Sequence, residues 1–114
     1  MTIRLDLASD AAIGPSEVRL LEAIASEGSI RGAARARGIS YRHAWLVIEE
    51  VEQDLGGKVT IAETGGRGGG GTALTALGRE VIELYRAVEK VALLATYTKL
   101  LALSSLTRPS VASS

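Results

Sequence analysis

Basic side chains cluster in one short region of this sequence, and a group of acidic side chains follows directly. The basic group is Arg31, Arg35, Arg37 and Arg42 with His43, and the acidic group is Glu49, Glu50, Glu52 and Asp54. A helix that enters DNA with its N-terminus leading needs this polarity, because its first turn meets phosphates and its dipole favours anions there. The alternative is that these acids and bases pair on a solvated surface. Net charge does not decide between them, since 13 Lys+Arg balance 13 Asp+Glu.

A glycine-rich stretch, "ETGGRGGGGTALT" from Glu63 to Thr75, is the second feature with chemical meaning. Glycines let a backbone approach DNA closely, and Arg67 among them can enter a groove or grip a phosphate. A phosphate-binding P-loop would end in Gly-Lys-Ser/Thr, whereas this run ends in Gly-Thr. A flexible linker is the remaining alternative, and the strand-like segments on both sides weaken it. We therefore expect a loop that contacts DNA.

The groups that catalysis and metal binding require are scarce. The chain has no Cys and one His, and its carboxylates do not cluster beyond a helix surface. Acid–base, thiolate and metal chemistry therefore lack their side chains, and we expect no catalytic residue, no metal ligand and no cofactor. His43 has no His, Cys or carboxylate four residues later, which favours a solvated or phosphate-contacting side chain.

Helix signals surround the basic cluster. Residues 3–7 alternate as a short strand, and a first helix then follows Pro15 and stops at Gly28. A short helix begins after Ser29 and ends at Gly38, and a third begins after Ser40 and ends at Gly56. The first helix has an apolar stripe at Val18, Leu20, Leu21, Ile24 and Ala25. The third has one at Tyr41, Ala44, Trp45, Ile48, Val51 and Leu55.

Trp45 lies on that apolar stripe, so we expect it in the core. Leu46 and Val47 fall off the stripe and are free to touch thymine methyl groups or to pack against a neighbour. The two helices joined by "RGIS" fit a helix-turn-helix, with 40–55 as the recognition helix.

A hairpin and a long helix complete the pattern. "KVTIAE" reads as a strand, "GTALT" as its antiparallel return, and residues 64–72 form the tip, or wing. Thr75 then caps a helix that continues through Leu103. The fold class we expect is mainly α with a small β-hairpin: a winged helix-turn-helix plus a long C-terminal dimerisation helix. The expected units are residues 1–91, a continuation of the helix over 92–106, and a disordered tail over 107–114.

Length and composition limit the number of domains and the cellular location that we expect. At 114 residues the chain suits one domain. The N-terminus lacks the apolar run of a signal peptide, and no stretch approaches about 18 uninterrupted apolar residues. We expect a cytoplasmic protein without a membrane partner. The Leu-rich stretch from Leu93 to Leu103 is too apolar for a free surface, which favours packing on a partner chain.

Three motifs together resemble one known family. "GISYRHAW", "TGGRGGGG" and "LT-x-x-G" (Leu74, Thr75, Gly78) resemble the DNA-binding domain of the ModE family, molybdate-responsive regulators related to LysR-type winged helices. The resemblance extends from Pro15 to Val91. It implies a homodimer, formed through the first and last helices, that binds a palindromic operator in double-stranded DNA. It also implies a recognition helix that begins at the Ser40–Tyr41 pair, and a glycine wing over Gly65–Gly71.

The residue pattern and the resemblance together predict two sets of contacts. The DNA-binding set is Ser29, Arg31, Arg35, Ser40, Tyr41, Arg42, His43, Thr64, Gly66, Arg67, Gly68 and Gly69. The dimerisation set is Leu20, Val81, Leu84, Tyr85, Val88, Val91 and Leu94.

One departure from the family concerns the effector. Full-length ModE proteins carry oxyanion-binding domains after the long helix, and this chain stops there, so we expect no molybdate binding in it. A link to molybdenum or tungsten metabolism is the context that the resemblance implies. The competing function is a protein-interaction module that heterodimerises with a full-length regulator and binds DNA weakly alone.

Overall fold

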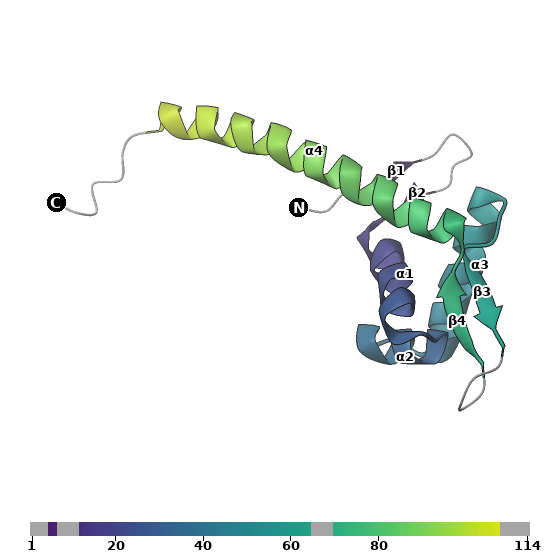
Figure 1. Cartoon of the computed structure of the whole chain (residues 1–114). Helices are drawn as coiled ribbons and strands as arrows, with labels where there is room; N and C mark the ends of the chain where they lie inside the picture. Colours follow the sequence, from purple (N-terminus) through teal and green to yellow (C-terminus); the bar gives the residue numbers. More distant parts are fainter. Residues whose placement is uncertain (1–4, 7–11, 65–69, 108–114) are drawn as a thin grey trace.

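The elements of the chain follow the order expected for a winged helix-turn-helix (Figure 1). The computed structural model describes residues 5–6, 12–64 and 70–107. They form β1 (Leu5–Asp6), β2 (Ala12–Ile13), α1 (Pro15–Glu27), α2 (Ile30–Arg37), α3 (Tyr41–Leu55), β3 (Thr60–Glu63), β4 (Gly71–Leu74) and α4 (Ala76–Leu106). The predicted fold class, mainly α with a small hairpin and a long last helix, is confirmed. The antiparallel pairing of β1 with β2 was not predicted.

The helix boundaries follow from capping residues, as the sequence predicted. Ser29 Oγ accepts a hydrogen bond from Gly32 N at 2.9 Å, and Ser40 Oγ accepts one from His43 N at 3.0 Å. The first three helices end at glycines in the left-handed region, where a side chain would be strained. These glycines are Gly28, Gly38 and Gly56, with φ of 77°, 71° and 69°.

The core lies between the first three helices and the start of α4. Val18, Leu21 and Ile24 of α1 face Ala33 and Ala34 of α2, and these small side chains let the two helices approach closely. The remaining buried side chains include Ala44, Ile48, Val51, Val59, Leu74 and Tyr85.

One member of the predicted α1 stripe is placed wrongly. Ala25 is exposed, whereas Leu20 and Ile24 are buried. The core-facing side of α1 therefore passes through Leu20 and Ile24 and not through Ala25.

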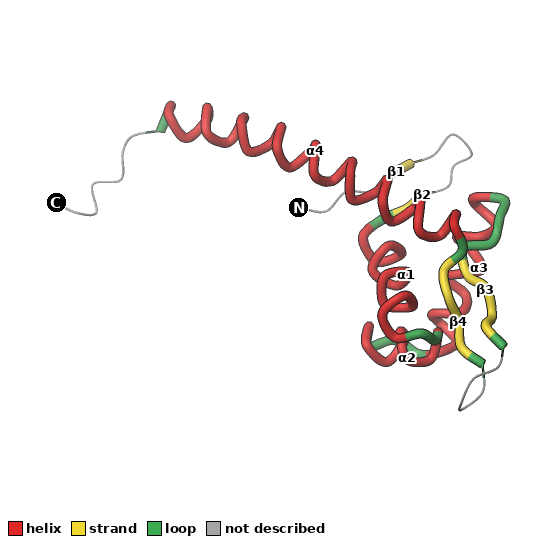
Figure 2. The backbone as a smooth tube through the Cα atoms, in the orientation of Figure 1, coloured by secondary structure: helices red, strands yellow, loops and turns green. Residues whose placement is uncertain are grey.

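The two strands of the hairpin β3–β4 pair with each other, and the hairpin is hydrogen-bonded to the turn after α1. Its register pairs Thr60 with Leu74 and Glu63 with Gly71. Thr72 N donates to Gly28 O at 2.8 Å, which joins β4 to the turn between α1 and α2. A Cβ on Gly71 would lie 2.6 Å from the same carbonyl oxygen, so this close approach requires glycine. The hairpin therefore has a fixed position beside α3 (Figure 2).

The long helix α4 starts on the hairpin and then leaves the rest of the molecule. Thr75 Oγ1 accepts from Gly78 N at 3.1 Å and donates to Lys58 O at 2.6 Å. Farther along, Arg86 donates to both carboxylate oxygens of Glu22 on α1, at 2.6 and 3.1 Å. The second half of α4 projects away from the other elements (Figure 1), and the molecule extends 66 Å in its longest dimension. Among the described helices, none is both long and apolar enough to cross a membrane.

The Arg86 pair fixes the direction of α4 relative to α1. Hydrogen bonds from its guanidinium to Glu22 and then to Glu89 raise the pKa of Arg86 further above its ordinary value.

Candidate nucleic-acid interface

Three of the predicted DNA-binding arginines, Arg31, Arg35 and Arg42, lie with the starts of α2 and α3 at the end of the body remote from α4 (Figure 1). Ser29 and Ser40 cap α2 and α3 there, so the unpaired N–H groups and the positive dipole ends of both helices are available to phosphates. Arg31 and Arg35 are exposed on α2. The guanidinium carbon of Arg31 lies 4.6 Å from the centre of the Tyr41 ring, and this cation–π contact joins the first turns of α2 and α3.

The outward ridge of α3 is formed by Arg42 and Leu46. They stand four residues apart, on the side of the helix opposite buried Ile48 and Val51, and both are exposed. Leu46 is 45% exposed, which leaves an apolar side chain one turn after a basic one. Val47 behaves differently, because it is half-buried and packs against the core. The sequence left two roles possible for Leu46 and Val47, contact with a thymine methyl group or packing against a neighbour. Of these two side chains, only Leu46 is exposed enough for the first role.

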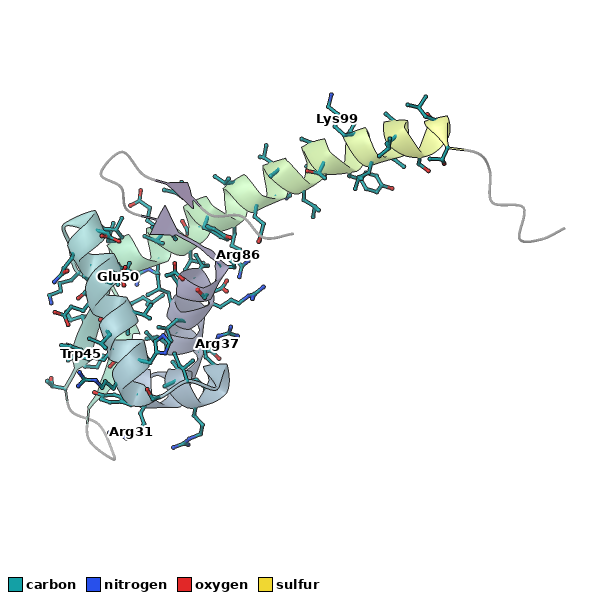
Figure 3. All side chains as sticks on the ribbon, turned by 180° about the vertical axis from the view of Figure 1, so that it is seen from behind. Arg31, Arg37, Trp45, Glu50, Arg86 and Lys99 are labelled. Carbon is teal, nitrogen blue, oxygen red and sulfur yellow. The ribbon has the colours of Figure 1, made fainter. Side chains whose placement is uncertain are left out.

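The prediction that Trp45 lies in the core is wrong. Its side chain is 48% exposed, and Tyr41 at the start of the same predicted stripe is 44% exposed. The reason is the course of the hairpin, which contacts the far end of α3 and diverges from its near end. Figure 3 shows Trp45 on the outer side of α3. Ala44, Ile48 and Val51 form the side of α3 that is buried.

A groove of about 510 Å³ occupies the space between α3 and the hairpin. Its lining is Ile30, Trp45, Ile48, Glu49, Glu52, Lys58, Thr60, Ile61, Ala62 and Thr72. The lining is apolar around Trp45 and Ile61 and charged toward Glu52 and Lys58. The groove opens between α3 and the strands of the hairpin.

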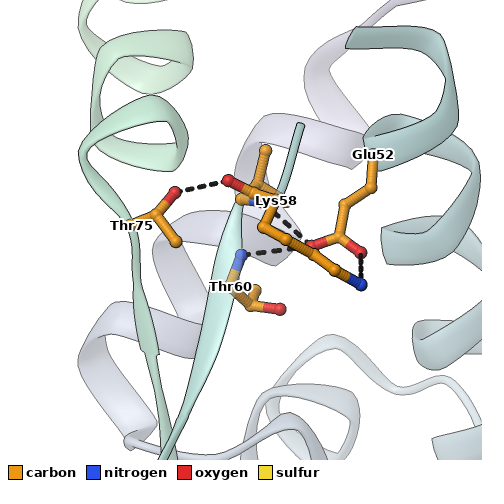
Figure 4. Close-up of polar contacts among 5 residues, drawn as sticks. Glu52, Lys58, Thr60 and Thr75 are labelled. Atoms are coloured by element: carbon orange, nitrogen blue, oxygen red, sulfur yellow. Dashed lines mark hydrogen bonds and ion pairs between the residues drawn. The ribbon is translucent and has the colours of Figure 1, made fainter. Parts of the chain in front are cut away.

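Glu52 connects the recognition helix to the hairpin (Figure 4). Its Oε2 accepts from Val59 N at 2.9 Å and from Thr60 N at 3.3 Å, and its Oε1 lies 3.4 Å from Lys58 Nζ. On the other side of the same segment, Thr75 N donates to Val59 O at 3.0 Å. The carboxylate is only 13% exposed. Sequence reasoning assigned Glu52 to an acidic helix end and missed this role, because its partners lie seven and eight residues away.

The charge polarity predicted for the recognition helix is present in three dimensions. In Figure 3, Arg31 lies at the lower end of the body, and Glu50 lies toward the start of α4. Glu50 and Asp54 are exposed at that far end. His43 is exposed near Arg37, on the flank of α3 toward α1, where both line a small groove with Ser16, Leu20, Ile39 and Val47.

Part of the predicted wing lies outside the described residues, namely Gly65, Gly66, Arg67, Gly68 and Gly69. Thr64, at the end of β3, is described and exposed. The strands on either side of the tip pair as predicted.

The predicted dimerisation set divides into two groups. Leu84, Val88, Val91 and Leu94 are exposed on α4 and available to a partner. Leu20, Val81 and Tyr85 are buried in the core of their own chain, at 3%, 9% and 1% exposure, so assigning them to a partner surface is wrong. The first turns of α4 have two apolar sides, one that faces the core (Val81, Tyr85) and one that is exposed (Leu84, Val88). Sequence periodicity alone did not distinguish the buried side from the exposed side.

The described residues contain no group of three or more His, Cys, Asp or Glu side chains that could hold a metal ion. At the end remote from α4, the described surface presents basic side chains, two helix N-termini and a groove that is apolar around Trp45 and Ile61.

Comparison with protein families gives a match over more than half of the chain. The model described as "bacterial regulatory helix-turn-helix protein, lysR family" matches residues 15–79. The "molybdenum transport protein ModE" of Azotobacter vinelandii is 41% identical over 85 residues, which are 75% of this chain and 32% of that protein. The "DNA-binding transcriptional dual regulator ModE" of Escherichia coli (strain K12) is 44% identical over 71 residues, 62% of this chain and 27% of that protein. The chain spans less than a third of the length of either relative.

Solved structures with a similar fold include two complexes with DNA. The CbnR DNA-binding domain bound to DNA matches with a TM-score of 0.57 and 24% identity, over 77% of this chain and 95% of that chain. The BenM DNA-binding domain bound to the benA site matches with a TM-score of 0.54 and 23% identity, over 76% of this chain and 93% of that chain. At these identities the likeness concerns the fold alone.

Proposed function

Because this chain belongs to the LysR family of bacterial regulatory helix-turn-helix proteins, we propose that it is a sequence-specific, DNA-binding transcriptional regulator that works as a dimer in the cytoplasm. The observation that carries the proposal is the shared end of α2 and α3. This end holds two capped helix N-termini and the Arg31–Tyr41 contact. It also holds the exposed side chains of Arg31, Arg35 and Arg42. α3 enters the major groove with this end leading, and Arg42 and Leu46 face the bases.

The remaining basic and polar groups position the domain on the phosphate backbone. The groups that contact phosphates are the side chains of Arg31, Arg35 and His43 and the N–H groups at Ser29 and Ser40. Tyr41 holds the Arg31 side chain in place through their cation–π contact. The wing, with Thr64 at its described edge and Arg67 at its tip, reaches the adjacent minor groove. Glu52 holds the hairpin at a fixed position relative to α3, so both DNA-contacting elements approach together.

The dimer forms through α4. Leu84, Val88, Val91 and Leu94 share one side of this helix, here called the dimer stripe, and all four are exposed. A second copy that covers the dimer stripe brings two recognition helices to one side of the assembly. Twofold symmetry then requires a palindromic operator, with half-sites about 34 Å apart, or one turn of DNA.

The biological context that we propose is molybdenum metabolism. Two relatives carry names that refer to molybdenum transport or to the ModE regulator, and they are 41% and 44% identical to this chain. Both are more than three times as long as the matched region, so regulation by molybdate is not proposed for this chain.

Selection from a random duplex library tests the proposal directly. We expect enrichment of a palindrome, and we expect the logarithm of the binding constant to fall steeply with the logarithm of salt concentration, because several phosphates are contacted. If no sequence is enriched and binding persists only at low salt, the chain is not a sequence-specific regulator. The protein-interaction module would then be the better reading, and co-purification with a longer homologue would test it.

Arg42→Ala is expected to weaken binding to the selected operator by about tenfold and to relax preference at the base pair that Arg42 faces, because a bidentate contact contributes about 1–3 kcal/mol. Competition gel shifts with single-base operator variants measure both effects. Lys90→Ala is the matched control, since it removes one positive charge from exposed α4, far from α3. Equal losses for the two variants would remove Arg42 from the base-contacting set.

Leu46→Ala is expected to weaken binding by roughly three- to tenfold, the effect of one lost apolar contact. If Leu46 meets a thymine methyl group, replacing that thymine with uracil weakens the wild-type protein by a similar factor. The same replacement has little effect on the Leu46→Ala variant. Additive losses from the base change and the side-chain change would contradict this contact.

A further inference from the structure

Two large apolar side chains face the groove between α3 and the hairpin, here called the hairpin groove, and the proposed function gives neither of them a role. Trp45 lines the hairpin groove from α3 and Ile61 lines it from β3, and both side chains are exposed. Figure 3 shows Trp45 between Arg31, at the end of the body remote from α4, and Glu50. Large apolar side chains that are exposed together mark a surface that contacts another molecule.

The path of DNA in the proposed function determines what passes over the hairpin groove. There, α3 lies in the major groove of the duplex and the wing lies in the adjacent minor groove. One sugar–phosphate strand separates these two DNA grooves, so it must cross the space between α3 and the hairpin. The hairpin groove, of about 510 Å³, opens into that space.

The lining of the hairpin groove changes in character along α3. Trp45, Glu49 and Glu52 follow the spacing i, i+4 and i+7, and all three line the groove. The carboxylate of Glu52 is bound to the amides of Val59 and Thr60. Glu49 forms no ion pair with any residue in the described part of the chain. The end near Trp45 is therefore apolar, and the end near Glu49 repels phosphates.

A DNA strand presents two surfaces of opposite character to this lining. Its phosphates are anionic, whereas the carbon atoms of each deoxyribose form a small apolar surface. The flat indole of Trp45 and the branched side chain of Ile61 suit the sugar carbons. Lys58, the cation of the lining, is already paired with Glu52 and so does little to draw phosphates inward.

We infer that Trp45 and Ile61 hold a deoxyribose of the strand that crosses the hairpin groove, and that Glu49 excludes the phosphates from the rest of it. This contact rests on the proposed function and adds to it a fixed depth of insertion for α3. It carries no sequence information, because every nucleotide of DNA has the same sugar. Trp45 therefore positions the protein on DNA, whereas its neighbour Leu46 faces the bases.

Trp45→Ala is expected to weaken operator binding by about tenfold, because apolar contact area is lost. The same factor is expected on every single-base variant of the operator. The slope of the binding constant against salt is expected to stay the same, because no phosphate contact is lost. Competition gel shifts at several salt concentrations measure these quantities, and circular dichroism checks the fold of the variant.

Leu46→Ala is the matched variant, and it is expected to change the preference among the same operators. Three results in Trp45→Ala overturn the inference. They are a changed base preference, a salt slope reduced by about one, and an unchanged affinity.

The intrinsic fluorescence of the chain reports on the contact directly, because Trp45 is its single tryptophan. Saturating operator is expected to shift the emission to shorter wavelengths and to lower the acrylamide quenching constant, since a sugar replaces water over the indole. Ile61→Gln makes the facing wall polar and is expected to reduce this protection. Quenching that is equal with and without operator overturns the inference. Protection that grows with protein concentration in the absence of DNA places a second copy in the groove and also overturns it.

The role of Glu49 is tested by two variants that remove the same charge from neighbouring positions. Of Glu49 and Glu50, only Glu49 lines the hairpin groove. Glu49→Gln is expected to raise the affinity for DNA of any sequence by roughly threefold, and Glu50→Gln by less, because the carboxylate of Glu49 is closer to the crossing strand. Equal gains would mean that both act through net charge alone, which overturns the role of Glu49.

The outcomes separate this inference from the proposed function. A wild-type chain that selects and binds an operator while Trp45 stays accessible to acrylamide overturns the sugar contact and leaves the regulator intact. A wild-type chain that binds no operator overturns the proposed function itself.

Discussion

A Gly78→Ala variant is expected to lose about 3 kcal/mol of folding free energy, a large fraction of the stability of a small domain. Gly78 lies in the first turn of α4, where this helix passes directly over the backbone of Val59, the residue before β3. A Cβ at this position would overlap the carbonyl oxygen of Val59. That oxygen also accepts the hydrogen bond from Thr75 N, so α4 cannot shift without weakening its own cap. Urea unfolding followed by circular dichroism measures the loss.

Gly56→Ala is the matched control for this prediction. Gly56 has φ of 69° and no atom within 4 Å of an added Cβ, so the substitution carries only the strain of the left-handed region, about 1 kcal/mol. Both variants must be compared at one protein concentration, because the proposed dimer would contribute to the measured stability. If Gly78→Ala unfolds at the same urea concentration as Gly56→Ala, the approach of α4 to the backbone of Val59 is looser than described.

Glu52→Ala is expected to destabilise the protein by about 2 kcal/mol, because charge-assisted hydrogen bonds to Val59 N and Thr60 N disappear together. Val59 is fully buried, so its amide has no ready access to water after the change. Thermal unfolding measures the stability. A competition gel shift measures operator affinity, which is expected to fall as well because the wing is no longer held beside α3.

Lys58→Ala isolates the ion pair from the amide contacts. The Lys58 side chain is 81% exposed, so its pairing with Glu52 is expected to contribute less than about 0.5 kcal/mol. A Lys58→Ala variant that loses as much stability as Glu52→Ala would mean that charge pairing, not the binding of two amides, positions the hairpin.

The local structure was predictable because each boundary has a chemical cause. Ser29, Ser40 and Thr75 each provide a hydroxyl oxygen that accepts a backbone N–H bond, and these caps are where the sequence placed them. The "LT-x-x-G" motif has a physical explanation in the same terms. Thr75 caps α4 and binds Lys58 O, and Gly78 leaves room for Val59 O.

The errors in predicting burial arose where apolar residues at helical spacing can face either the core of their own chain or the surface. Helical periodicity put Trp45 on the same side of α3 as Ile48, and only the path of the hairpin leaves it exposed. In α4, Tyr85 and Val88 are both apolar at helical spacing, yet the first belongs to the core and the second faces solvent. The role of Glu52 depends on amides in another element, and no local signal in the sequence marks such a contact.

The continuity of α4 has a consequence for the spacing of operator half-sites. Its 31 residues run without interruption from the Thr75 cap on the hairpin, so they form one rod about 46 Å long. No hinge separates the part that binds the hairpin from the part that carries the dimer stripe. In the proposed dimer, the distance between the two DNA-binding ends is therefore set by the point at which the two rods cross. In the proposed dimer, reading a different spacing would require one helix to slide along the other, in steps of about one 5.4 Å turn.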